Sequence, residues 1–190
     1  EAVNTDPSIG VVGPMIYYSY ERDQVWFAGL RFRHGLYVLR GGLHLQPPLN
    51  TIEEVDFISG CGMLVSRQTW ESVGLFDPRF FMYYEDLDFC IRVKESGYRI
   101  VCATQAQMWH ALSASTGGPD SPLKQYYQVK STVLFSQKHT YGWRRLATVA
   151  LRLGHAGFIT LRQVMRGQLR WEAVRFYAKG VVDAFLTRNG

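Results

Sequence analysis

Three carboxylates stand within four positions of the chain, at Glu85, Asp86 and Asp88. Apolar residues then recur at helical spacing as far as Gly97, which is a residue type that commonly ends a helix. The acids therefore fall in the first helical turn, where free N–H groups and the helix dipole favour ionised carboxylates. A carboxylate held in this way beside aromatic side chains can act as a general base. An acidic first turn is equally typical of a helix cap without any catalytic role.

An aromatic run precedes these acids and indicates that the helix begins in partly buried surroundings. Its members are Phe80, Phe81, Tyr83 and Tyr84. Such rings can stack on a cyclic ligand, although ordinary core packing explains an aromatic run equally well. Further along, Trp109 and His110 end an extended segment. By itself this histidine is explained as a core or strand-end residue.

The remaining pattern predicts strands and short helices up to about residue 110 and only helices from about residue 123. Strands are expected at 9–14 with an extension to 18, at 25–30, at 55–58 resuming at 63–65 after a glycine-rich bend, at 98–103 and at 107–110. Further helices are expected at 66–73, 123–139, 143–165 and 168–186. Segments 31–48 and 111–122 are expected to be loops. This order predicts an α/β fold followed by a helical extension.

Length and composition are those of a globular protein with a real core. The chain has 190 residues, of which 47% are hydrophobic and 19% are charged. Cys61, Cys90 and Cys102 lie among apolar residues without CxxC spacing, so we expect reduced core thiols of a cytosolic protein and neither a disulfide nor a zinc site. No apolar run reaches the roughly 18 residues of a membrane span. The chain starts without Met and in mid-pattern, so we expect a piece of a longer protein.

Basic residues are concentrated in the last third of the chain. Against Glu172 and Asp183, this part carries Lys138, Arg144, Arg145, Arg152, Arg162, Arg166, Arg170, Arg175, Lys179 and Arg188. Such an excess predicts an anionic partner, for which a membrane surface, a phosphorylated substrate and a nucleic acid are the candidate classes. The helices could rest on an anionic bilayer, or they could be ordinary packed helices with a solvated basic face.

The chain resembles the C-terminal half of family 2 glycosyltransferases, which have the GT-A (nucleotide-diphospho-sugar transferase) fold. The resemblance is strongest to bacterial rhamnosyltransferase-like members and rests, in order, on IGVVGP, VDFISGCGMLVSRQTWESVGLFDPRFFMYYEDLDFCIRVKESGYRI and MWH. The later segments YYQVKSTVLFSQKH and GVVDAFLTRNG are similar to the tail of those enzymes. The resemblance implies a partial GT-A fold, with the acceptor-side half at 1–122 and a C-terminal helical region at 123–190.

The resemblance also implies roles for individual residues. Asp86 would be the general base that deprotonates the acceptor hydroxyl in an inverting transfer, and Glu85 would orient it or bind the acceptor. The bend at 59–62 would form the floor of the acceptor site, unless it is a β-bulge without a ligand. The residues expected to bind the acceptor are Ser59, Gly60, Cys61, Gly62, Tyr83, Tyr84 and Trp109.

In that family a divalent metal on a DxD motif and an N-terminal half hold the nucleotide-sugar. Here Asp86-Leu87-Asp88 has that spacing but belongs to the second acidic motif. The donor half and its DxD are therefore expected upstream of Glu1, and the chain by itself is expected to be inactive. His110 aligns with a histidine that completes the metal shell in some relatives. The metal would be Mn²⁺ or Mg²⁺.

The function implied is transfer of a sugar from a nucleoside diphosphate to a glycan or a lipid-linked acceptor, as in cell-wall polysaccharide biosynthesis. Rhamnose from dTDP-rhamnose is the leading donor by family analogy. The protein would then be cytoplasmic or peripheral on the inner face of the cell membrane. The alternative is a non-catalytic carbohydrate- or membrane-binding module on a truncated scaffold. A nucleic-acid-binding domain ranks last, because no known motif accompanies the basic residues.

Overall fold

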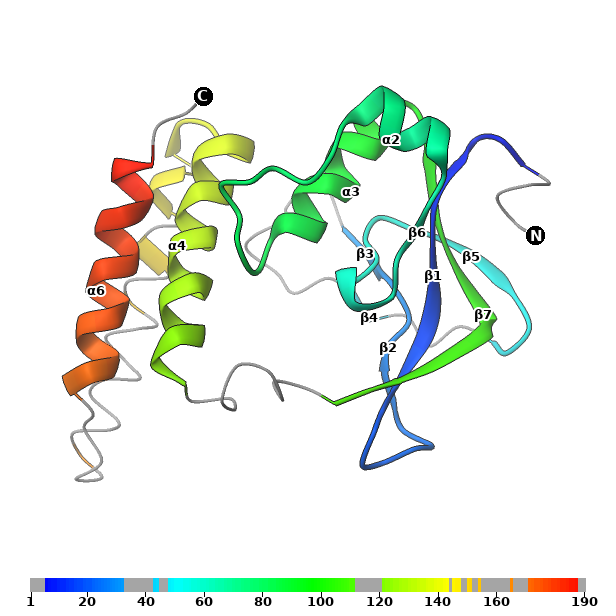
Figure 1. Cartoon of the computed structure of the whole chain (residues 1–190), viewed down its shortest axis with the longest axis horizontal. Helices are drawn as coiled ribbons and strands as arrows, with labels where there is room; N and C mark the ends of the chain where they lie inside the picture. The colour runs from blue at the N-terminus through cyan, green and yellow to red at the C-terminus, as the bar shows by residue number, and fades with distance from the viewer. Residues whose placement is uncertain are drawn as a thin grey trace. The chain divides into compact units, whose positions relative to one another are not determined.

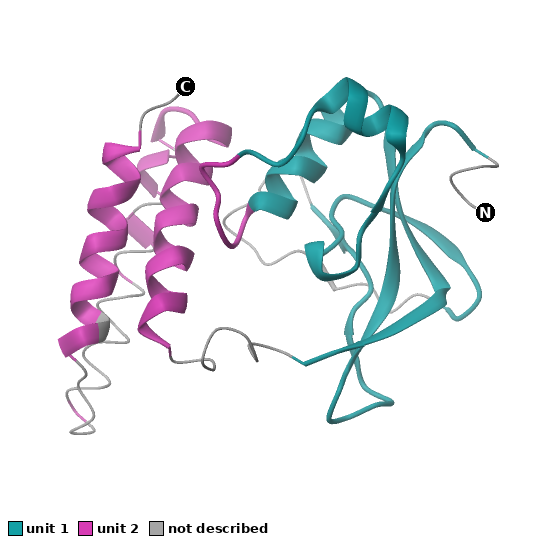
Figure 2. Cartoon of the chain, viewed as in Figure 1, with its two compact units in different colours: residues 1–77, 85–112 teal, residues 78–84, 113–190 magenta. Residues whose placement is uncertain are grey.

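The computed structural model describes residues 6–32, 43–44, 48–111, 121–143, 145–147, 150–151, 154, 165 and 171–187. Figure 2 shows its two compact units. The first unit comprises Glu1–Asp77 and Glu85–Leu112, and the second comprises Pro78–Tyr84 and Ser113–Gly190. The short segment before the acidic helix thus packs with the C-terminal helices. The expected domains at 1–122 and 123–190 stay a prediction.

The first unit is built on a mixed β-sheet (Figure 1). Its strands are β1 (Ile9–Tyr18), β2 (Val25–Phe27), β5 (Ile52–Val55), β6 (Leu64–Val65) and β7 (Arg99–His110). The order is β2-β1-β7-β5, with β6 also paired to β1. β1 and β7 run parallel, and every other pair is antiparallel. β3 (Leu30–Arg31) and β4 (Leu43–His44) form a separate antiparallel pair. The predicted α/β class is confirmed.

Two predicted strand assignments were wrong in the same way, because local patterns do not reveal which neighbour a strand pairs with. The segments 98–103 and 107–110 form one strand, β7. Its register with β1 shifts at two points, between Ile9 and Val11 and again where Ala103 lies opposite Pro14 and Gln107 lies opposite Met15. The segments 55–58 and 63–65 are not one resumed strand, since β5 pairs with β7 and β6 pairs with β1.

The short helices of this unit follow the predicted signals. The 3-10 turn η1 (Gly60–Gly62) leads through β6 into α2 (Arg67–Val73). The Ser66 side chain caps α2 by accepting the N–H of Thr69, and Gly74 ends the helix with a φ of 81°. The acidic helix is α3 (Glu85–Glu95), and Gly97 follows it with a φ of 85°.

The core of the first unit fixes α3 on the sheet. Phe89 and Val93 of α3 are fully buried together with Val11 of β1 and Ile100 of β7. Burying side chains of this size contributes about 1.5–3 kcal/mol each. Cys90 and Cys102 are buried free thiols, as expected, but Cys61 is exposed because it lies in the η1 turn. The prediction of three core cysteines was therefore wrong for Cys61.

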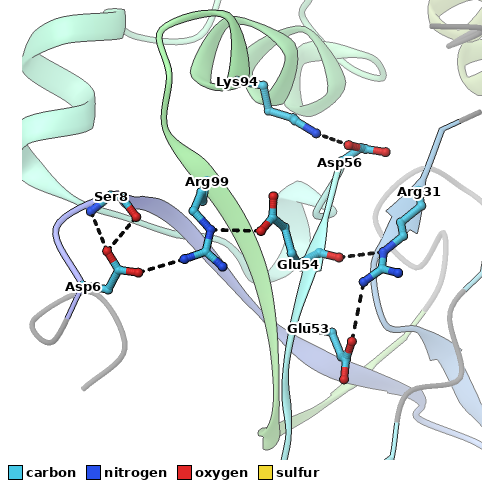
Figure 3. A network of polar contacts seen from close by, with 8 residues as sticks. All are labelled: Asp6, Ser8, Arg31, Glu53, Glu54, Asp56, Lys94 and Arg99. Carbon is cyan, nitrogen blue, oxygen red and sulfur yellow. Dashed lines mark hydrogen bonds and ion pairs between the residues drawn. The ribbon is translucent and has the colours of Figure 1, made fainter. Parts of the chain in front are cut away.

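A surface network of ion pairs ties α3 and β7 to strand β5 (Figure 3). Lys94 of α3 pairs with Asp56, just after β5. Arg99 of β7 pairs with Glu54 of β5 at 2.9 Å and with Asp6 at 2.8 Å. Single exposed pairs contribute little, but several joined charges restrict the register of the strands that carry them. The C-terminal end of α3 and the first residue of β7 are thereby attached to the β5 edge of the sheet.

The second unit contains α4 (Pro122–His139) and α6 (Trp171–Leu186), which pack closely (Figure 1). The phenol of Tyr126 donates to Asp183 at 2.6 Å. At Gly180, a Cβ atom would come within 2.7 Å of the backbone carbonyl of Tyr126 and within 2.5 Å of Val129, so only glycine allows this approach. The predicted helix at 123–139 is confirmed. Most of the expected helix at 143–165, residues 168–170, and most of both predicted loops lie outside the described residues.

Candidate active site

Asp86 occupies the first turn of α3 and faces the η1 turn. The backbone N–H of Gly60 donates to its Oδ2 at 2.8 Å, and the N–H of Leu87 donates to its Oδ1 at 2.8 Å. Burial raises the pKa of this carboxyl, while the N–H groups of Gly60 and Leu87 pull the pKa down. Across the described parts of the chain no ion pair reaches Asp86. The carboxylate is thus oriented without being neutralised, as a general base requires.

Glu85 differs from its neighbour in its surroundings. Its Oε2 is buried and has no hydrogen-bond partner among the residues that the structure describes. Burial and the nearby charge of Asp86 raise the pKa of Glu85 to about 7. A carboxyl with this pKa is partly protonated near neutral pH, so it can donate as well as accept a hydrogen bond.

Asp88 has a structural role. Its side chain is 0% exposed and pairs with Nε of Arg92 at 3.0 Å. The same guanidinium donates to the carbonyl of Val73 at 2.9 Å and to that of Leu75 at 2.8 Å. The pair therefore ties the segment that follows α2 to the middle of α3. Asp86 and Asp88 share the spacing of a DxD motif, but their side chains have different partners.

The expected acceptor bend at 59–62 is the η1 turn, closed by the N–H of Gly62 donating to the carbonyl of Ser59 at 3.1 Å. A Cβ at Gly60 would lie 3.2 Å from the Cβ of Asp86, so glycine permits the close approach. Cys61 lies 3.3 Å from the Ser59 hydroxyl. The structure therefore brings Ser59, Gly60 and Cys61 to Asp86. It also brings Gly62 against Met108, whose Sδ would be 2.5 Å from an added Cβ.

Trp109 and His110 end β7 and point to opposite faces of the sheet, because successive strand residues alternate. Trp109 is 42% exposed, stacks on Tyr17 at 5.7 Å between ring centroids, and donates its indole N–H to the carbonyl of Arg22. The His110 ring lies 5.2 Å from that of Trp26. His110 shares its face with Met108, the residue that approaches Gly62.

Tyr83 and Tyr84 belong to the second unit. Both have left-handed backbone angles, with φ values of 67° and 69°. Non-glycine residues rarely adopt this conformation, and each costs about 1–3 kcal/mol. The Tyr84 ring packs on Phe135 with a centroid distance of 5.0 Å. The expected stacking of these tyrosines on an acceptor stays a prediction.

The described residues do not form a complete metal-binding site by themselves. They contain no group of three or more His, Cys, Asp or Glu side chains that could hold an ion together. His110 could therefore supply one ligand at most, and the other ligands would have to come from elsewhere. The expectation that a DxD in the donor half holds most of the metal shell stays a prediction.

Sequence reasoning missed two contributors to the site's geometry. Arg92 could have been found, because it stands four residues after Asp88 on the same helix face. Met108 left no recognisable signal, because it approaches the η1 turn only through the fold.

Comparison with known proteins gives the relationship of the chain. The model of glycosyl transferase family group 2 matches residues 2–182. An N-acetylglucosaminyl-diphospho-decaprenol L-rhamnosyltransferase of Mycobacterium tuberculosis is 31% identical over 190 residues, covering 90% of this chain and 59% of the relative. The dTDP-rhamnosyl transferase RfbF of Shigella flexneri is 29% identical over 108 residues, covering 53% and 36%.

A more distant relative is the low-salt glycan biosynthesis hexosyltransferase Agl10 of Haloferax volcanii, 21% identical over 142 residues and covering 74% of this chain and 46% of that protein. The chain thus spans 59% of the length of its mycobacterial relative. Its mixed sheet with packed helices is consistent with a GT-A-like domain. With the family model matched along most of its length, the chain belongs to glycosyl transferase family group 2.

Proposed function

We propose that this chain supplies the acceptor side of an inverting sugar transferase in which Asp86 is the general base. An acceptor hydroxyl attacks the anomeric carbon of a nucleoside-diphosphate sugar, its proton passes to Asp86, and the nucleoside diphosphate leaves from the opposite face. The observation that carries the proposal is the Asp86 carboxylate, held by the N–H groups of Gly60 and Leu87 and without an ion pair in the described chain.

Acceptor binding is assigned to the surroundings of this carboxylate. Glu85 has a buried oxygen that no described residue hydrogen-bonds, and a raised pKa, so it suits a hydrogen bond to a second sugar hydroxyl. The η1 turn places the Ser59 hydroxyl beside Cys61, close to the base. Trp109 offers a partly exposed indole on which a sugar face could stack.

The donor site is proposed to lie mostly outside this chain. The sequence contains one DxD, and Asp88 of that motif is buried in its pair with Arg92. His110 would add a single nitrogen ligand to Mn²⁺ or Mg²⁺ held elsewhere. Such an ion would neutralise the charge that develops on the leaving diphosphate. The chain alone is accordingly expected to bind an acceptor without completing transfer.

The substrates are proposed from the relatives' names. Two relatives are named as rhamnosyltransferases, and one of these names specifies a diphospho-decaprenol acceptor. We therefore propose dTDP-rhamnose as the donor and a lipid-linked or glycan molecule as the acceptor. The full-length protein should release dTDP from dTDP-rhamnose in the presence of a lipid-linked acceptor. Release of nucleotide from other nucleotide-sugars only would overturn this donor assignment.

A membrane surface is a further proposed partner. In the described segments no helix has the length and apolar character needed to cross a bilayer. One face of α6 nevertheless exposes Trp171, Val182 and Phe185 at 55–71%, with Arg175 on the same face. Apolar side chains beside a basic residue suit the boundary of an anionic bilayer. Peripheral attachment would bring the acceptor site to a lipid-linked substrate.

The alternative is a binding module without transfer activity. Such a module would use the acceptor-binding groups Glu85 and Trp109 without a donor site. The decisive experiment is a screen of nucleotide-sugars with the full-length protein. Turnover that depends on Asp86 supports the transferase. Acceptor binding without turnover of any donor would support the module.

A further inference from the structure

We propose that Ser131 of α4 is a positioning residue for Asp86, and that one face of α4 serves to hold the segment that enters the acidic helix. This inference rests on the proposed transfer reaction. It concerns contacts within the second unit and the peptide bond that joins Tyr84 to Glu85.

The contacts between α4 and this segment follow a single helix face. The Ser131 hydroxyl donates to the backbone carbonyl of Met82 at 2.7 Å, and Ser131 is 1% exposed. Ring contacts join Tyr127 to Phe81 at 4.9 Å and Phe135 to Tyr84 at 5.0 Å. Lys138 lies over the ring of Phe80, 5.9 Å from its centroid. Positions 127, 131, 135 and 138 are spaced as one stripe of an α-helix.

A different face of α4 packs on α6. Tyr126 bonds Asp183 and Val129 packs at Gly180, so a separate stripe carries the helix pairing. The pairing with α6 thus uses other positions than 127, 131, 135 and 138. Each of these four positions contacts a residue of the segment 78–84.

That segment needs support from outside itself. Tyr83 and Tyr84 both have positive φ values, a conformation that persists only where surrounding contacts over-determine it. Ser131 bonds the carbonyl immediately before this pair, and Phe135 packs on the ring at its end. The strained turn is held at both ends.

The strained turn leads directly into the proposed base. Met82 precedes Glu85 by three residues and Asp86 by four. A change in the turn therefore alters where the first turn of α3 starts. Asp86 depends on that start for its 2.8 Å bond from Gly60. Small displacements of a reacting group of this kind lower the rate of the chemical step more than they lower binding.

The test compares two buried hydroxyls that are adjacent on α4. Thr132 is 2% exposed, but its hydroxyl donates to Gln128 within its own helix at 2.7 Å. In the full-length protein, Ser131→Ala should lower kcat about tenfold, leave the KM for the donor unchanged, and shift the acidic limb of the kcat–pH profile. Thr132→Val should leave all three close to those of the parent. Melting temperatures of both variants show whether each is folded.

Each outcome decides the inference. A normal kcat and pH profile for a folded Ser131→Ala variant, or equal losses in the two variants, would overturn it. If Ser131→Ala does not fold, Ser131→Thr is tested instead, because it keeps the hydroxyl and is expected to retain kcat. A tenfold loss of kcat in a folded Ser131→Thr variant would overturn the positioning role of the hydroxyl. Asp86→Asn separates the two hypotheses. Full activity in that variant refutes the proposed function, whereas its inactivity beside a normal Ser131→Ala refutes the positioning role alone.

Discussion

The carboxylate of Asp86 accepts a hydrogen bond from the backbone N–H of Gly60, a residue 26 positions earlier in the chain, at 2.8 Å. The bond joins the start of α3 to the η1 turn, which itself touches Met108 of β7 through Gly62. A base bound to the backbone keeps its direction without losing its charge to a cation. The remaining lone pairs of the carboxylate stay available for an acceptor hydroxyl.

We expect Asp86→Asn to lower kcat of the full-length protein by about a thousandfold, within the range typical of general-base removal. The asparagine oxygen can still accept from Gly60, so folding and donor binding should persist. Steady-state kinetics and donor titration measure these two properties. Glu71→Gln, which alters only an exposed pair with Arg67, is the matched control and should behave as the parent. Unchanged turnover in Asp86→Asn would remove this residue from the mechanism.

Gly60→Ala should displace the same carboxylate. Its new Cβ would lie 3.2 Å from the Cβ and 3.4 Å from Oδ2 of Asp86, so one of the two groups must shift by a few tenths of an ångström. We expect kcat to fall about tenfold, with little change in melting temperature. Gly154→Ala is the control, since no atom of the described residues lies within 4 Å of its added Cβ. Equal kcat in the two variants would show that this approach does not matter for the reaction.

Much of the helical structure was predictable because its signals are local. Ser66 and Gly74 bound α2, and Gly97 follows α3, as residue types alone indicated. The strands were less predictable. The polar residue Gln105 lies where the register with β1 is irregular, yet the strand continues because pairing with β1 resumes at Gln107, opposite Met15.

The site itself was predictable in part. The pattern of acids indicated Asp86 and placed it correctly at the start of a helix. It could not reveal the bond to Gly60, which depends on tertiary folding. The left-handed backbone of Tyr83 and Tyr84 was equally hidden, because tyrosine has no preference for that conformation. Cys61 was misjudged because its apolar neighbours in sequence gave no sign of the exposed turn.

Glu85 should make stability depend on pH. Burial, with the charge of Asp86, raises the pKa of Glu85 from its ordinary 4.5 to about 7 in the folded protein. The folded state therefore binds the proton more tightly than the unfolded state, and the free energy of unfolding falls as pH rises through this window. Glu85→Gln removes this loss. We expect the variant to gain on the order of 1–2 kcal/mol over the parent between pH 4.5 and pH 8, after allowance for solvent screening.

Urea unfolding at a series of pH values measures this difference. Glu71→Gln is again the control, because Glu71 is an exposed side chain, and its profile should run parallel to that of the parent. A difference between Glu85→Gln and the parent that stays constant from pH 4.5 to pH 8 would contradict the raised pKa. Asp86 contributes with the same sign in all three proteins, so the comparison isolates Glu85.

The apolar face of α6 predicts binding to anionic vesicles. Val182 and Phe185 are 55% and 61% exposed, and replacing both by serine removes apolar surface without touching the buried Ala184. We expect at least about a tenfold loss of co-sedimentation with phosphatidylglycerol vesicles. Full burial of one such side chain contributes about 1.5–3 kcal/mol of binding free energy. Leu75→Ser, at an exposed leucine of the first unit, should bind as the parent does. Unchanged binding of the double variant would exclude this face as the docking surface.

His110 tests the proposed share of the chain in metal binding. The described residues hold no group of three potential ligands, so an ion kept by the donor half would receive at most this one nitrogen. His110→Ala should then raise the Mn²⁺ concentration needed for half-maximal activity about tenfold without abolishing turnover at saturating metal. Manganese titrations of the full-length protein measure it, with His139→Ala as the control because that ring packs on Phe135 in the second unit. Loss of a ligand must weaken metal binding. Identical titrations for His110→Ala and the parent would therefore show that His110 is not a metal ligand and only packs against Trp26.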